Sequence, residues 1–195
     1  SICLGMFDAS VYDMTGAYCI FANQGEWRKP TYLLRIEDKN GNVIYTNHTP
    51  FVQVLNQQTA YVMSYMLKGV IEEGTGVRLR YKYGLTNPIG GKTGTTNDNS
   101  DGWFIGITPQ LVTGVWTGCE DRDIHFDLQH GEGANSALPI FALYMKQVYA
   151  NPALGIKKDV DFTMPKNGIN IVTDCSVYNQ KQQGTPTEPD KKLSF

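Results

Sequence analysis

Charged residues are scarce in this sequence. Asp, Glu, Lys and Arg make up 18% of the 195 residues, against about 25% in an average soluble domain. The 17 basic and 19 acidic residues give a formal net charge of −2, and no run of Lys or Arg stands out. Because binding to nucleic-acid phosphates requires a basic face, this composition argues against a nucleic-acid partner.

Residues that could hold a metal or form disulfides are also few. Four cysteines are scattered along the chain without a C-x-x-C pair: Cys3, Cys19, Cys119 and Cys175. We expect mostly free or buried thiols, and the sequence leaves all three complete pairings open. The histidines have no ligand spacing: His48, His125 and His130. We therefore expect solvated histidines, no metal and no cofactor.

No stretch of the sequence is convincing as a membrane span. Residues 49–67 and 102–119 lack charge, but the first contains Pro50 and the second contains four glycines and Pro109. The start of the chain shows no basic region followed by an apolar one, so no signal peptide is visible. A chain that begins at Ser1 suggests a piece of a longer protein. Its length suits one domain with a sizeable core.

Helical periodicity predicts three helices, over residues 10–23, 56–73 and 137–149. Ser10 followed by Asp13 suits a capping box, and Ser136 is the expected cap of the third helix. The second and third helices have apolar stripes that we expect to face a core: Ala60, Met63, Leu67 and Val70, then Leu138, Phe141, Met145 and Val148.

The remaining pattern predicts strands. A hairpin is expected over residues 32–45, turning at Asn40-Gly41, where positive φ angles cost little. Further strands are expected around residues 89–96, 103–107 and 111–117. Gly106 and Gly114 remove side chains from two of them, which suggests that a helix approaches the sheet there.

These elements indicate an α/β protein of the α+β type, in which an antiparallel sheet packs against helices and the hairpin is an appendage. We assign residues 1–165 to one domain and residues 166–195 to a C-terminal tail. From residue 179 onward the sequence is rich in Gln, Lys, Thr and Pro, so we expect the tail to be partly disordered.

The segment Gly91-Lys92-Thr93-Gly94-Thr95-Thr96 allows three interpretations. A phosphate loop would need a glycine at position 86, which is Thr86, and a helix after the motif rather than a strand. A calcium loop over residues 97–108 would need Glu where Thr108 stands. The third interpretation is the K-T-G motif of serine acyltransferases that act on penicillins and D-alanyl peptides.

Aromatic and acidic side chains near this segment are expected to have structural rather than catalytic roles. We expect Trp103 and Trp116 to pack in the core, as aromatic residues on strands usually do. Asp98 and Asp101 are expected to shape the turn after the motif rather than to act as catalytic carboxylates.

Several motifs in order closely resemble the class A, bifunctional penicillin-binding proteins. The resemblance runs from Leu4-Gly5 to Pro165 and rests on these segments: Gly69-Val70, Gly74-Thr75-Gly76, Gly91–Thr96, Asp101–Gly106, Leu111–Trp116, Glu120-Asp121-Arg122, Gly133-Ala134-Asn135 and Ala137–Ile140. It implies part of the five-stranded sheet of the penicillin-binding transpeptidase fold.

The resemblance also implies an activity, namely peptidoglycan D,D-transpeptidation through a serine acyl-enzyme. By this resemblance Lys92 supplies positive charge beside the serine and the substrate carboxylate. Thr93 and Thr95 would bind that carboxylate, and Gly94 would let the substrate lie against the backbone. The N–H of Thr95 would be one donor of the oxyanion hole. We expect these groups to project together from one extended segment.

The sequence departs from the family in one respect that matters. The family carries its nucleophile in S-x-x-K and a second motif, S-x-N, before K-T-G. None of the seven serines has Lys three residues later or Asn two residues later. Without a nucleophile Lys92 cannot form an acyl-enzyme. We therefore expect the C-terminal part of a transpeptidase domain that is inactive alone.

Two other functions stay open: a catalytically silent scaffold or binding module of the same fold, and, less favoured, a β-lactamase. For the longer protein the resemblance implies stem peptides and β-lactams as partners, a glycosyltransferase, and an N-terminal anchor at the periplasmic face of the inner membrane. The missing N-terminal half of the domain would be a further partner. Its absence predicts self-association or marginal stability.

Overall fold

The computed structural model of the chain describes residues 5, 7–127 and 129–173. In order, the main elements of this part are α1 (Val11–Ala22), β1 (Glu26–Arg28), β2 (Arg35–Glu37), β3 (Val43–Thr46), β4 (Phe51–Gln53), α2 (Gln57–Glu72), α3 (Arg78–Tyr81), β5 (Gly90–Thr95), β6 (Asp101–Ile107), β7 (Val112–Gly118) and α4 (Ala137–Ala150). Short 3-10 helices lie at Asn97–Asn99 and Pro152–Leu154.

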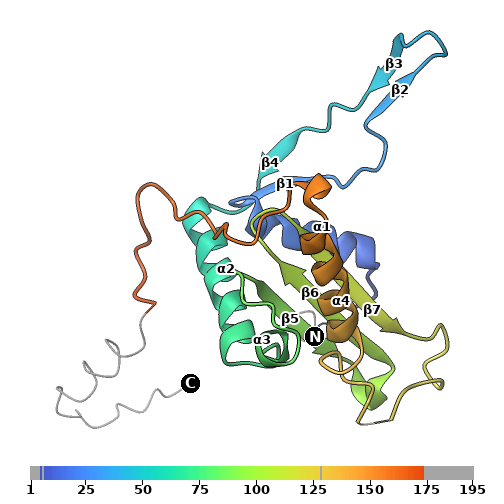
Figure 1. The fold of residues 1–195 in the computed structure, drawn as a ribbon, viewed down its shortest axis with the longest axis vertical. Coiled ribbons are helices and arrows are strands. Elements are labelled where there is room, and N and C mark those ends of the chain that lie inside the picture. Colours follow the sequence, from blue (N-terminus) through green and yellow to red (C-terminus); the bar gives the residue numbers. More distant parts are fainter. Residues whose placement is uncertain (1–4, 6, 128, 174–195) are drawn as a thin grey trace, which may run out of the picture.

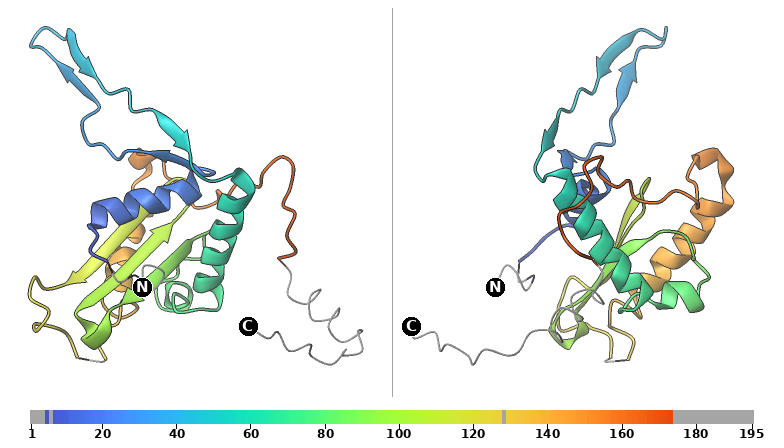
Figure 2. Two further views of the ribbon diagram at one scale, coloured as in Figure 1. Left: turned by 180° about the vertical axis from the view of Figure 1, so that it is seen from behind. Right: turned by 90° about the vertical axis from the view of Figure 1, so that its left-hand side faces the viewer.

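A three-stranded antiparallel sheet of order β5-β6-β7 forms the centre. Helix α4 lies on one face of this sheet and α1 on the other, while α2 runs beside β5 (Figures 1 and 2). This arrangement confirms the predicted fold class, and the three strands are those that the sequence predicts around the Lys92 segment.

Two glycines in the sheet admit helices at close range, as predicted. A Cβ atom on Gly106 would lie 2.3 Å from the Phe141 ring of α4, and one on Gly114 would lie 2.2 Å from Thr15 Oγ1 of α1. Real Cβ atoms do not approach neighbours this closely. The two glycines therefore set the distance of a different helix on each face of the sheet.

The core lies between the sheet, α4 and the end of α2. All four apolar side chains expected to face inward from α4 are buried, and Phe104 packs on Phe141 with ring centroids 4.9 Å apart. In α2 the prediction is half wrong, because Ala60 and Leu67 are buried but Ser64 and Ile71 occupy the other inward positions. Met63 and Val70 are only partly buried.

Two of the helix starts have the side-chain caps that their sequences favour. Ser10 Oγ accepts from the N–H of Asp13 at 3.0 Å, and Asn56 Oδ1 accepts from the N–H of Thr59 at 2.8 Å. The prediction for α4 is wrong. Ser136 has helical φ and ψ angles and makes no cap, and its hydroxyl bonds with Thr117 Oγ1 and Glu132 O instead.

The predicted hairpin, β2–β3, extends away from the rest of the chain as an arm (Figure 1). Its turn is longer than predicted, because residues 38–42 lie between the paired residues Glu37 and Val43. Of Asn40 and Gly41, only Gly41 has a positive φ. The carboxylate of Asp38 accepts from the N–H groups of Asn40 and Asn42 and holds the loop. At the base of the arm, β1 pairs with β4. The sequence pattern did not predict this ribbon or α3.

After α4 the chain returns across α2. Lys68 Nζ lies 2.9 Å from both carboxylate oxygens of Asp161 and fastens this segment to the helix. The tail predicted from residue 166 lies largely outside the described residues, and its boundary stays a prediction. Within the described part of the chain, no helix combines the length and apolarity required for crossing a membrane.

Candidate functional site

Strand β5 places the K-T-G segment at an edge of the central sheet. Among the described residues it pairs with β6 only, through Lys92–Ile105, Thr93–Phe104 and the neighbouring pairs. The N–H of Thr96 donates toward β6, to Asp101 O at 3.1 Å. Because successive N–H groups of a strand point in opposite directions, the N–H of Thr95 points to the outer edge of the sheet.

The functional side chains predicted on this strand are all accessible. Lys92 and Thr95 are exposed, and Thr93 is half-buried. Lys92 forms no ion pair with a described residue, and its Nζ donates to Thr93 O at 2.7 Å. Since that carbonyl belongs to the outer edge, the ammonium also lies at this edge, with its charge available to an anion.

The expectation that all three side chains project together is only partly met. Side chains alternate along a strand, so Lys92 and Gly94 leave on the α1 face while Thr93 and Thr95 leave on the α4 face. Lys92 reaches the outer edge because its ammonium folds back onto the carbonyl of Thr93. The Thr93 hydroxyl meets Thr75 of the loop after α2, the helix that runs beside β5. A ligand that contacts all of them must therefore lie along this edge rather than on one face.

Two loops from distant parts of the sequence touch the K-T-G strand. Thr75, just after α2, has its Oγ1 2.8 Å from Thr93 Oγ1. The N–H of Gly133, before α4, donates to Thr95 Oγ1 at 3.0 Å. A Cβ atom on Gly133 would lie 2.4 Å from Gly94 O. Both segments stand out as motifs in the sequence, but nothing in the sequence indicates these contacts.

Of the two carboxylates predicted to shape the turn after β5, Asp101 does so, whereas the exposed side chain of Asp98 makes no hydrogen bond with a described residue. Asp101 accepts from Thr96 Oγ1 at 2.9 Å and from Trp116 Nε1 at 2.8 Å, and Arg122 lies 3.5 Å away. Partial burial acts to raise the pKa of Asp101. The hydrogen bonds from Trp116, Thr96 and Ser100, with the charge of Arg122, outweigh burial and hold this pKa below its ordinary value.

Neither tryptophan is a core residue, so that prediction is wrong. Trp116 is 37% exposed and uses its indole N–H to bind Asp101. Trp103, its cross-strand partner on β6, is half-buried. Both side chains lie on the α1 face of the sheet, but only Trp103 is on the strand next to β5, where it pairs with Gly94.

The histidines and cysteines form no site in the described part of the chain. All three histidines are exposed, and the described residues include no cluster of His, Cys, Asp and Glu suited to a metal ion. Cys19 and Cys119 are free and half-buried, and burial raises the pKa of the Cys19 thiol. Cys3 and Cys175 lie outside the described residues.

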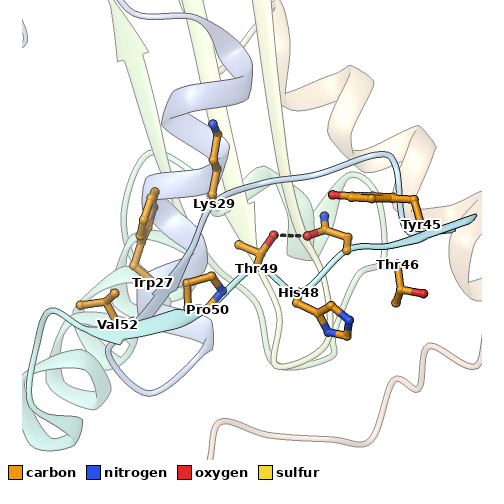
Figure 3. Close-up of a pocket in the computed structure, with 9 residues that line it drawn as sticks. Trp27, Lys29, Tyr45, Thr46, His48, Thr49, Pro50 and Val52 are labelled. Carbon is orange, nitrogen blue, oxygen red and sulfur yellow. Dashed lines mark hydrogen bonds between the residues drawn. The ribbon is translucent and has the colours of Figure 1, made fainter. Parts of the chain in front are cut away.

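A hollow in the described surface lies elsewhere, at the base of the hairpin arm (Figure 3). Trp27, Tyr45, His48 and Pro50 are among the residues that line it, and it is broadly open to solvent. It contains none of the K-T-G residues. We place the candidate site at the outer edge of β5 instead, because the K-T-G residues lie on that strand and this hollow is broadly open to solvent.

Comparison with known proteins identifies the class of protein that this fold and edge strand define. The family model "Penicillin binding protein transpeptidase domain" matches residues 2–119. The chain belongs to this family. It is 38% identical over 175 residues to penicillin-binding protein 1A of Aquifex aeolicus, covering 88% of the chain and 22% of that relative. The class A resemblance of the sequence is thereby confirmed.

Solved structures show the same fold. The crystal structure of penicillin-binding protein 1A from Haemophilus influenzae matches with a TM-score of 0.69 and 23% identity, over 79% of this chain and 28% of that one. Penicillin-binding protein 3 of Mycobacterium tuberculosis, complexed with ampicillin, matches with a TM-score of 0.54 and 23% identity, over 80% and 39%. The chain thus spans about a fifth to two fifths of these proteins.

Proposed function

We propose that this chain is part of a serine D,D-transpeptidase that cross-links peptidoglycan stem peptides. The observation that carries the proposal is the outer edge of β5. There the Lys92 ammonium, the hydroxyls of Thr93 and Thr95 and the N–H of Thr95 are all accessible along one strand. Such a row of donors suits an extended peptide that ends in a carboxylate, which charge-assisted hydrogen bonds hold strongly.

The reaction proceeds in two acyl transfers. The oxygen of a serine attacks the penultimate D-Ala carbonyl, the C–O bond forms, and the C–N bond to the terminal D-Ala breaks as the leaving amine takes a proton. An amine of a second stem peptide then attacks the ester carbonyl. The C–N bond of the cross-link forms, the C–O bond to the serine breaks, and a proton lost by the attacking amine restores the serine hydroxyl. β-Lactams acylate the same serine when their ring amide opens.

In this proposal the residues of β5 bind and stabilise rather than attack. Lys92 lowers the energy of negative charge at the reacting centre and at the substrate carboxylate. Thr93 and Thr95 donate to that carboxylate, and Gly94 leaves room for the peptide backbone. The N–H of Thr95 stabilises the oxyanion, a contribution of about 2.7–4 kcal/mol for such a donor.

The serine and its general base must come from outside this chain, because S-x-x-K and S-x-N are absent from it. We therefore propose that the chain acts together with the N-terminal half of the transpeptidase domain and is inactive alone. Its partners are then stem peptides and β-lactams, as the ampicillin complex of the Mycobacterium tuberculosis relative supports. The longer protein would carry a glycosyltransferase and an N-terminal anchor in the cell envelope.

Labelling with fluorescent penicillin tests the proposal. The longer protein should form a stoichiometric acyl adduct, visible by mass spectrometry, whereas this chain alone should form none. Lys92→Ala should slow acylation of the longer protein by about 100-fold with little change in thermal unfolding. Lys39→Ala, at the exposed tip of the hairpin arm, is the matched control and should leave the rate unchanged.

Three results would count against this function. An adduct on the chain alone would contradict the absence of a nucleophile. Unchanged acylation kinetics in Lys92→Ala would remove Lys92 from the site. A longer protein that penicillin does not label would favour the alternative, a catalytically silent scaffold of the same fold.

A further inference from the structure

The segment Gly74-Thr75-Gly76 is held tightly at the end of α2. The N–H of Gly76 donates to Val70 O at 2.9 Å, so the chain turns back over the last turn of the helix. A Cβ atom on Gly74 would lie 2.9 Å from the Val70 backbone, and one on Gly76 would lie 2.5 Å from Ile71 Cδ1. The missing side chain of Gly74 lets the backbone approach Val70 closely, and Gly76 packs against Ile71 in the same way. Thr75 is the residue with a side chain between them.

A second contact, made just after this segment, joins it to the loop before α4. Arg78, at the start of α3, donates to Ala134 O at 3.2 Å and to Asn135 Oδ1. The neighbouring residue Gly133 contacts Thr95. The loop that carries Thr75 and the loop before α4 are therefore joined to each other as well as to β5.

Within this frame Thr75 meets Thr93 hydroxyl to hydroxyl, at 2.8 Å. A hydroxyl has one hydrogen to donate and can accept two. If Thr93 is to donate to an anionic ligand, its oxygen must be the acceptor in this pair and Thr75 the donor. A donor to its oxygen also polarises the Thr93 O–H group, which strengthens the bond that Thr93 makes onward.

We propose that Thr75 is a positioning residue for the transpeptidase site. It orients the Thr93 hydroxyl so that the hydrogen points to the terminal carboxylate of the acyl donor. This inference rests on the proposed function, in which Thr93 binds that carboxylate. It assigns a specific role to a residue outside the K-T-G segment, 18 positions earlier in the chain.

The test uses the longer protein and two acylating probes, benzylpenicillin and its methyl ester, which lacks the carboxylate. Thr75→Val removes the hydroxyl and keeps the branched shape, whereas Thr75→Ser keeps the hydroxyl. For benzylpenicillin, Thr75→Val should lower the second-order acylation constant by about 3- to 10-fold, the effect of one hydrogen bond. The loss should lie in binding rather than in the limiting acylation rate.

The other variants separate positioning from structure. Thr75→Ser should stay within about twofold of wild type, and the ester should react with Thr75→Val at nearly the wild-type rate. Thr93→Val should lose at least as much as Thr75→Val on benzylpenicillin, and the double variant should lose no more than Thr93→Val alone, because the two hydroxyls act as a unit. Thr86→Val, an exposed threonine outside these contacts, is the control.

The outcomes distinguish the two levels of the proposal. Wild-type acylation by Thr75→Val beside a slow Thr93→Val would overturn the positioning role and leave the proposed function intact. Equal losses on both probes would show that Thr75 only supports the fold, which also overturns it. Wild-type acylation by Thr93→Val would instead overturn the proposed role of the edge strand.

Discussion

The backbone N–H of Gly133 donates to Thr95 Oγ1 at 3.0 Å and joins the loop before α4 to the last residue of β5. Two residues that are 38 positions apart thus share one hydrogen bond at the candidate site. The contact is possible because Gly133 has no side chain. A Cβ atom there would lie 2.3 Å from Trp103 O and 2.4 Å from Gly94 O.

We therefore expect Gly133→Ala to displace the loop from β5. In the longer protein, acylation by penicillin should fall by about tenfold or more, because a misplacement of about 1 Å can cost 100-fold in rate. Gly69→Ala is the matched control, since its Cβ would meet nothing within 4 Å on α2. A Gly133→Ala protein with wild-type acylation would show that the loop does not position the edge strand.

The packing of α4 on the sheet gives a prediction about stability. Gly106→Ala should destabilise the chain by about 1–3 kcal/mol, as overpacking does, because the new methyl would lie 2.3 Å from the Phe141 ring. Urea unfolding measures the loss. Adding Phe141→Leu to Gly106→Ala should recover part of it by making room. If the double variant loses the sum of the two single losses, the clash is not the cause.

Local sequence signals predicted the central elements well. Gly106 and Gly114 indicated that helices approach the sheet, and the stripe on α4 named its buried side chains correctly. These predictions depend on periodicity and on the missing Cβ atom, which are properties of single segments. The strand with Lys92 and the two strands after it were predictable for the same reason.

The errors concern contacts between segments. Ser136 has the residue type of a helix cap, but its hydroxyl bonds with Thr117 of β7. Trp116 is a large aromatic residue on a strand, which favours a position in the core. Its indole N–H instead donates a hydrogen bond to Asp101 at the surface. Likewise Thr75 and Gly133 became part of the site only when the fold brought them to β5. A propensity cannot encode such a partner, because the partner lies far away in sequence.

Exposed apolar side chains on the hairpin arm lead to a prediction about association. Tyr32 is 94% exposed, Leu34 69% and Ile44 68%, and the outer edge of β5 has no strand partner among the described residues. We expect the isolated chain to form dimers or larger species at micromolar concentration in sedimentation velocity experiments. Ile44→Lys should reduce this association, whereas Thr86→Lys, away from the arm, should not.

A chain that sediments as a single monomeric species and melts at a high temperature would contradict this expectation. It would mean that the apolar arm and the open strand edge are tolerated in water. The missing half of the domain would then not be needed to cover them.

Asp101 gives a prediction about pH. Its pKa in the folded chain lies below the ordinary value of 3.8, despite partial burial, because Trp116, Thr96 and Ser100 donate to the charged form and Arg122 lies nearby. A carboxyl with a lowered pKa adds stability above its unfolded pKa, and that contribution disappears as the pH falls through the folded pKa. Asp101→Asn should therefore unfold at lower urea concentration than wild type near about pH 7.

The difference between the two proteins should shrink as the pH is lowered from about 5 toward 2, where wild-type Asp101 also becomes neutral. Asp98→Asn, an exposed neighbour in the same turn, is the matched control and should show a much smaller difference at every pH. If the Asp101→Asn difference stays constant down to acid pH, the contribution of Asp101 comes from packing and neutral hydrogen bonds. The charged form would then not be what holds the turn after β5.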